Sequence, residues 1–128
     1  MATAPDIKAV ISERYQKFEH VFNLGDFKGV AQLFTPGGKC LLHGRKTLNG
    51  RQEILDAFDS GSLGVQHIDE NKCEEVFGKY GDEFVTSRGS CKLTSKDGAK
   101  TISCKDVVVW KFVDGEYLVE VDISNSDE

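Results

Sequence analysis

Two Asp-Gly dipeptides in the C-terminal half constrain the fold of this chain more than any other feature. They are Asp97-Gly98 and Asp114-Gly115, and they separate runs of alternating or β-branched residues. Those runs lie near 84–94, 100–112 and 116–124. Asp-Gly between such runs is the strongest short-range signal for a β-hairpin with a two-residue turn. The sequence therefore predicts three consecutive antiparallel strands, with a fourth strand before them near 65–77.

A two-residue turn also fixes which residues face each other, so the two turns predict a register. The pairs expected across the first turn are Leu93 with Ile102, Cys91 with Cys104 and Val85 with Trp110. The pairs expected across the second turn are Phe112 with Tyr117, Trp110 with Val119, Val108 with Val121 and Asp106 with Ile123. This register divides the side chains of the sheet between an apolar face and a mixed face.

The two faces make different demands on the fold. The apolar face carries Trp110 and cannot be left in water. On the mixed face, Arg88 and Asp122 flank Val107, one strand away on each side. Neighbouring strands lie about 4.8 Å apart, so the two backbones would be roughly 10 Å apart, a gap that long side chains can bridge.

The N-terminal half predicts three helices. Apolar residues recur at helical spacing from Ile7, and Gly25 ends that helix. Asp26 can cap a short second helix that Pro36-Gly37-Gly38 stops. A short strand around Cys40 to His43 follows, and a third helix runs from Asn49-Gly50 to Gly61. We expect one α+β domain over residues 1–128.

Composition and motifs exclude several classes of function. The chain has 16 basic and 21 acidic residues, a formal charge of −5, so we expect no nucleic acid partner. No run approaches a membrane span and the first residues lack a signal-peptide pattern, so we expect no membrane partner and a cytoplasmic location. The cysteines form no C-x-x-C pair, and no histidine or carboxylate stands at metal-ligand spacing, so we expect neither a metal nor a cofactor.

The order of motifs along nearly the whole chain resembles a known group. Asn-Leu-Gly-Asp-Phe and Leu-Phe-Thr-Pro flank the short helix, Gly-Arg-Gln-Glu-Ile opens the third, and the strands lead to Val-Val-Trp-Lys-Phe-Val-Asp-Gly-Glu-Tyr. This order resembles the nuclear transport factor 2-like superfamily, which includes ketosteroid isomerases, polyketide cyclases and the association domain of calcium/calmodulin-dependent kinase II. The resemblance implies a cystatin-like cone, in which three N-terminal helices pack on a highly curved, mainly antiparallel sheet and close a pocket.

The resemblance also implies a homodimer that forms through the sheet face remote from the pocket. We expect the apolar face to serve this purpose. The predicted interface residues are Cys91, Cys104, Val108, Trp110, Tyr117, Val119 and Val121.

The mixed face would then line the pocket, and Arg88 falls where the association domain places a pocket arginine. The candidate pocket residues are Tyr15, Phe18, His43, Phe58, His67, Arg88 and Asp122. A pair of Arg88 with Asp122 would orient a ligand carboxylate, which favours a small anionic ligand, and a surface salt bridge is the alternative for this pair. His43 and His67 lie near the expected mouth, where each is either a general base or a hydrogen-bonded structural residue.

The sequence departs from the isomerases at the positions that carry their chemistry. Phe18 stands where they have a catalytic tyrosine, and Leu42 where they have a proton-abstracting aspartate; neither side chain can perform that role. The favoured hypothesis is a non-catalytic homodimeric module that binds a small ligand or mediates association. The alternatives are a cyclase, dehydratase or isomerase that uses His67 or Asp122 as base, and a transport or scaffold adaptor with a vestigial pocket.

Overall fold

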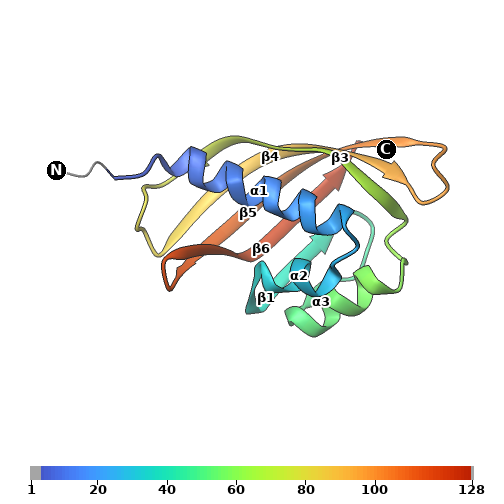
Figure 1. The fold of residues 1–128 in the computed structure, drawn as a ribbon, viewed down its shortest axis with the longest axis horizontal. Coiled ribbons are helices and arrows are strands. Elements are labelled where there is room, and N and C mark those ends of the chain that lie inside the picture. Colours follow the sequence, from blue (N-terminus) through green and yellow to red (C-terminus); the bar gives the residue numbers. More distant parts are fainter. Residues whose placement is uncertain (1–3, 128) are drawn as a thin grey trace.

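A computed structural model describes residues 4–127, which form three helices and one six-stranded sheet (Figure 1). The helices are α1 (Ile7–Asn23), α2 (Phe27–Gln32) and α3 (Gly50–Asp59). The strands are β1 (Phe34–Leu42), β2 (Leu48–Asn49), β3 (Val65–Phe77), β4 (Phe84–Ser95), β5 (Thr101–Val113) and β6 (Glu116–Ser126). Their order in the sheet is β2-β1-β6-β5-β4-β3, and only the β1–β6 pair among them is parallel. This arrangement confirms the predicted α+β architecture.

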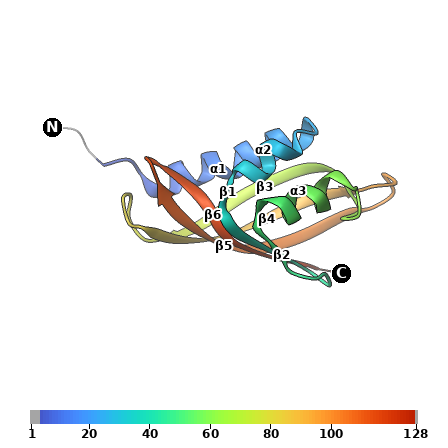
Figure 2. The same cartoon turned by 90° about the horizontal axis from the view of Figure 1, so that it is seen from below.

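All three helices pack on one side of the sheet, which curves toward them (Figure 2). α1 packs along β3, α3 packs on β1, and α2 lies between the other two helices. No helix within residues 4–127 has the length and apolar character that crossing a membrane would need.

The helix boundaries follow from local sequence, as predicted. Gly25 ends α1 with φ +76°, a conformation that glycine adopts without strain. The carboxylate of Asp26 accepts a hydrogen bond from the Gly29 amide at 2.9 Å and caps α2. One boundary differs, because Phe34 begins β1 instead of extending α2. The amide of Val119 in β6 donates to the Leu33 carbonyl at 2.8 Å, which pairs the chain with the sheet from that point.

The register of the first hairpin is confirmed. Cys91 faces Cys104, and the pairs Leu93–Ile102 and Val85–Trp110 form as expected. The turn of the second hairpin is also confirmed, since Asp114 and Gly115 both have positive φ, as a type I′ turn requires.

Beyond the start of the second hairpin the predicted register is wrong. Trp110 pairs with Val119, but Val109 pairs with Val121, so Glu120 is an extra residue in β6 and forms a β-bulge. The bulge shifts every later residue by one position. Asp122 therefore faces Val108, where Val121 was expected, and Ser124 faces Asp106, where Ile123 was expected.

The helices of the same chain cover the apolar sheet face. Tyr117 is fully buried, and Trp110 and Val119 are each 3% exposed. Cys104 and Val108 are buried as well, and Cys91 is partly buried. The predicted dimer interface is therefore wrong for these six residues, because the apolar stripes of the helices already meet this face. Val121, the seventh, lies on the opposite face because of the bulge.

Candidate functional site

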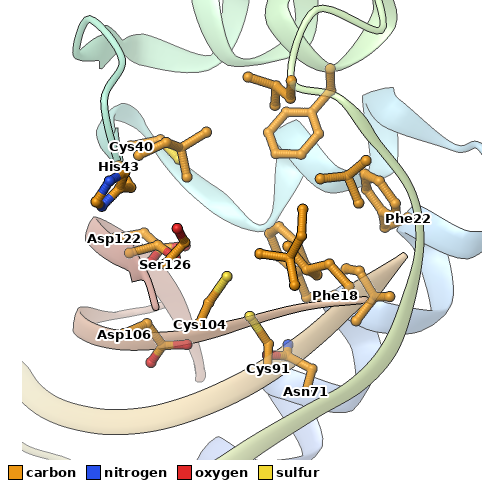
Figure 3. Close-up of a pocket in the computed structure, with 18 of the residues that line it drawn as sticks. Phe18, Phe22, Cys40, His43, Asn71, Cys91, Cys104, Asp106, Asp122 and Ser126 are labelled. Atoms are coloured by element: carbon orange, nitrogen blue, oxygen red, sulfur yellow. The ribbon is translucent and has the colours of Figure 1, made fainter. Parts of the chain in front are cut away.

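A cavity of about 460 Å³ lies between the three helices and the concave sheet face (Figure 3). Helix residues and inward-facing residues of β1, β3, β4, β5 and β6 line it. Its two ends differ in chemistry. Figure 3 shows Phe18 and Phe22 at one side, and Asp106, Asp122 and His43 at the other.

The apolar end is built from four phenylalanines of the helices. Phe58 of α3 contacts Phe18 and Phe22 of α1 edge to face, with ring centroids 6.3 and 5.8 Å apart. Phe27 of α2 lies 6.3 Å from Phe58. Because these rings pack against one another, they form a rigid apolar wall of the cavity.

The polar end contains a chain of four hydrogen-bonding side chains. The indole nitrogen of Trp110 donates to the Ser87 hydroxyl, the Ser87 hydroxyl bonds the Tyr15 hydroxyl, and Tyr15 donates to Asp106 Oδ1, each at 2.8 Å. Indole is only a donor and the single Tyr15 proton goes to Asp106, so Ser87 must donate to Tyr15. Each hydrogen bond in this series is therefore donated in the direction of the Asp106 carboxylate.

Burial raises the pKa values of the two titratable groups of this network, Asp106 and Tyr15. It raises the pKa of Asp106 to about 6, against the opposing effect of the hydrogen bonds from Tyr15 and the Gly89 amide. Burial also raises the pKa of Tyr15, and the negative charge of Asp106 adds to that effect. Tyr15 is therefore a permanent donor at neutral pH.

Asp122 is the second carboxyl group of the cavity. Burial, together with the neighbouring charge of Asp106, raises its pKa to about 7. Its Oδ1 atom is buried and has no hydrogen-bond partner among residues 4–127. Buried polar atoms without partners are rare in folded proteins and call for an explanation.

Two of the thiols that line the cavity, Cys40 and Cys91, are neutral. A hydrogen bond with Cys104 raises the pKa of Cys91, and burial adds to it. Burial raises the pKa of Cys40, and the charge of Asp122 adds to it. A thiol is nucleophilic only as thiolate, so this site is not built for cysteine catalysis. No group of three His, Cys, Asp or Glu side chains in the described part of the chain could hold a metal ion.

Five of the seven candidate pocket residues line the cavity: Tyr15, Phe18, His43, Phe58 and Asp122. His43 stands exposed at its rim, where Nδ1 contacts Asn125 Oδ1. Asp122 reaches the cavity only because of the bulge in β6.

Arg88 and His67 lie outside the cavity, so their prediction as pocket residues is wrong. Arg88 points to the convex face and binds Glu75 Oε1 at 2.6 Å and Glu74 Oε2 at 2.8 Å. Its side chain is 53% exposed. The predicted pair with Asp122 does not form, because the bulge puts the two side chains on opposite faces. His67 is exposed on β3 and contacts Asp69, 3.0 Å away.

Sequence reasoning missed Asp106 and Ser87. The signal for Asp106 was present, since it alternates with Cys104, Val108 and Trp110 and so shares their inward face. A single carboxylate inside an apolar stripe is a marker of a functional site. Ser87 alternates with Val85 in the same way.

Solved structures with the same arrangement identify the fold. A ketosteroid isomerase-like protein from Erwinia carotovora atroseptica superposes with a TM-score of 0.80 at 18% identity, covering 96% of this chain and 98% of that one. A nuclear transport factor 2-like protein of unknown function from Shewanella oneidensis superposes with a TM-score of 0.77 at 17% identity, covering 94% of this chain and 99% of that one. The chain has the nuclear transport factor 2-like fold. This fold recurs in a protein from Xanthomonas campestris described as a calcium/calmodulin dependent protein kinase II association domain, with a TM-score of 0.72 at 18% identity, covering 98% of this chain and 92% of that one.

At the level of sequence, no family model matches this chain. A stretch of 69 residues is 36% identical to Polarized growth protein L1 from Phoma sp.. The match covers 54% of this chain but only 5% of that much longer protein.

Proposed function

We propose that this domain binds a small, largely apolar molecule in its cavity. The observation that carries the proposal is a rigid phenylalanine wall that faces a buried carboxyl oxygen without a partner. A volume of about 460 Å³ lies within the range of small-molecule sites. Such sites are mostly apolar, with a few polar groups that fix the orientation of the ligand.

The proposal is tested with N-phenyl-1-naphthylamine, a neutral dye that fluoresces in apolar surroundings. We expect one molecule to bind per chain with a Kd in the micromolar range. Cys91→Trp should weaken binding at least tenfold, because Cys91 lines the cavity and an indole there would occupy it.

Lys92→Trp is the matched control, since the neighbouring side chain of β4 is exposed and points to the convex face. It should leave the affinity unchanged. Equal binding by both variants, or no uptake by the unaltered protein, would remove the cavity as a binding site and favour an adaptor function.

We further infer that the chain forms a homodimer through the convex sheet face. Four β-branched residues form a block there, because Val107 pairs with Ile123 and Val109 with Val121. Val107 and Ile123 are 45% and 46% exposed, and exposed apolar patches of this kind mark interaction surfaces. The likeness to a structure described as an association domain supports this inference. A cytoplasmic location stays a prediction.

The dimer is tested by sedimentation velocity on Ile123→Lys. In the dimer, a lysine in this block would be desolvated without a partner, so we expect a monomer where the unaltered chain sediments as a dimer. Thr101→Lys adds the same charge to an exposed position of β5 outside the block and should remain dimeric. A monomeric unaltered chain would contradict the inference.

A second candidate function is acid–base catalysis by Asp122. The observation that favours it is a carboxyl pKa of about 7 in an apolar cavity, which suits a group that takes and returns a proton. The isomerase positions are Phe18 and Leu42 in this chain, so Asp122 would have to replace the aspartate, and the Tyr15–Asp106 pair would have to stabilise the oxygen.

Conversion of a β,γ-unsaturated ketosteroid to its conjugated isomer, followed by absorbance, tests this candidate. If the domain catalyses it, Asp122→Asn should lower the rate by a factor of roughly 10² or more. Absence of turnover, or full activity of the asparagine variant, would reject catalysis by this residue.

A further inference from the structure

The cavity has an uneven distribution of charge. Asp106 and Asp122 lie on adjacent strands and share the inward face, and Asp106 is two residues from Val108, the residue opposite Asp122. Such diagonal neighbours have Cα atoms roughly 7–8 Å apart. One small group placed between their side chains could therefore contact both carboxyl groups.

The two carboxyl groups differ in what they already bind. Asp106 accepts hydrogen bonds from Tyr15 and from the Gly89 amide. Asp122 has a buried oxygen, Oδ1, without any partner in the described part of the chain. The structure thus leaves one buried acceptor for a donor that comes from outside the chain, and leaving it unpaired costs free energy.

Within residues 4–127, no basic side chain of the cavity lining is buried beside the two acids. His43 and Arg45 are the basic side chains of the lining, and both are exposed at its rim. Arg88 lies on the opposite face of the sheet, where Glu74 and Glu75 neutralise it. An anionic ligand would meet two carboxyl groups at short range, whereas a cationic one would be attracted by both.

We infer that the cavity takes an apolar molecule that carries a protonated amine, with the ammonium group against Asp122 and Asp106 and the apolar body against Phe18, Phe22 and Phe58. An ammonium group has three donors, which can serve Asp122 Oδ1, Asp106 and the Ser124 hydroxyl at the same end. This inference rests on the proposed binding function and specifies its ligand class. It reverses the anionic ligand that the sequence favours, because that prediction depended on Arg88.

Three probes of similar shape test the inference by displacing N-phenyl-1-naphthylamine. They are the cation 2-(1-naphthyl)ethylammonium, the neutral alcohol 2-(1-naphthyl)ethanol and the acetate, which is the anion of 1-naphthaleneacetic acid. At pH 7.5 we expect the amine to compete at a concentration at least tenfold lower than the alcohol. The acetate should be the weakest competitor. Asp122→Asn should reduce this preference for the amine severalfold, and the remaining carboxylate of Asp106 should keep a smaller part of it.

Glu120→Gln is the control, because it removes the same charge from the same strand at a residue that does not line the cavity. It should retain the preference for the amine. An amine that competes no better than the alcohol, or a preference that Asp122→Asn leaves undiminished, overturns the inference and leaves the binding function standing. Failure of the neutral dye itself to bind would instead overturn the proposed function.

Discussion

Replacement of Asp122 by asparagine should stabilise the protein at pH 8 and change its stability little at pH 4.5. Burial raises the pKa of Asp122 from 3.8 to about 7. The unfolded chain therefore releases this proton near pH 4, and the folded chain holds it until about pH 7. Between these values the folded state binds the extra proton, so the free energy of unfolding falls as the pH rises.

Asparagine stays uncharged at every pH and has nearly the shape of the protonated acid. The variant therefore avoids the fall in the free energy of unfolding that ionisation of Asp122 causes. A pKa difference of about three units corresponds to about 4 kcal/mol at pH 8, and to no more than about 1 kcal/mol at pH 4.5. The titratable groups facing Asp122 are Asp106, Cys40 and Cys91. The pKa of Asp106 is itself about 6. The free energy of unfolding of the variant should therefore still fall with rising pH, but less steeply than that of the unaltered protein.

Urea unfolding at pH 4.5, 6 and 8 measures the effect. Glu13→Gln makes the same change in net charge on the exposed surface of α1 and should follow the unaltered protein at each pH. Asp122→Asn without added stability at pH 8 would mean that the carboxylate is solvated there, and would contradict the buried position.

Gly89→Ala should destabilise the protein strongly. A Cβ atom at this position of β4 would collide with the Lys72 carbonyl oxygen of β3 and lie 2.7 Å from the Tyr15 ring. Neither can move away, because β3 is paired with β4 at this point and Tyr15 is held by Ser87 and Asp106. Overpacking of this kind costs about 3 kcal/mol, which corresponds to a fall in Tm of roughly 10 °C.

Gly37→Ala is the matched control for this substitution. No heavy atom lies within 4 Å of the added Cβ at Gly37, and neither glycine has positive φ. Thermal unfolding should show a change below about 0.5 kcal/mol for the control. Equal melting temperatures for the two variants would contradict the close packing of Gly89 against Lys72 and Tyr15.

Most of the fold could be predicted because its signals are local. Gly25, Asp26 and Gly61 mark helix ends by the conformation or hydrogen bond that each supplies, and the two Asp-Gly turns set the hairpins. Each of these signals acts over a few residues, so tertiary contacts did not override them.

The bulge in β6 has no local signal. Val119, Val121 and Ile123 alternate without a break, so the pattern predicts that all three share one face. At the same place β6 pairs irregularly with β1, which advances five residues, from Phe34 to Lys39, while β6 advances two, from Val119 to Val121. Gly38 permits the close approach, since a Cβ there would lie 2.9 Å from the Val119 carbonyl oxygen. A parallel contact between distant segments cannot be read from either segment alone.

The error over the two sheet faces has a different origin. The alternation correctly separated Arg88 from Trp110, but it does not state which face is concave. An apolar face needs a cover, and the phenylalanines of α1, α2 and α3 supply one from within the chain. Matching the apolar area of the helices to that of the sheet would have assigned the cavity to the tryptophan face.

The most direct test of the inward position of Asp122 is the titration of side-chain carboxyl carbons by ¹³C NMR, with Asp122→Asn to assign the signal. Asp122 should titrate at about pH 7, because the bulge turns it into the cavity, and Asp106 should titrate at about pH 6. A midpoint for Asp122 near the ordinary value of 3.8 would place this carboxyl in water and contradict both the bulge and the site built on it.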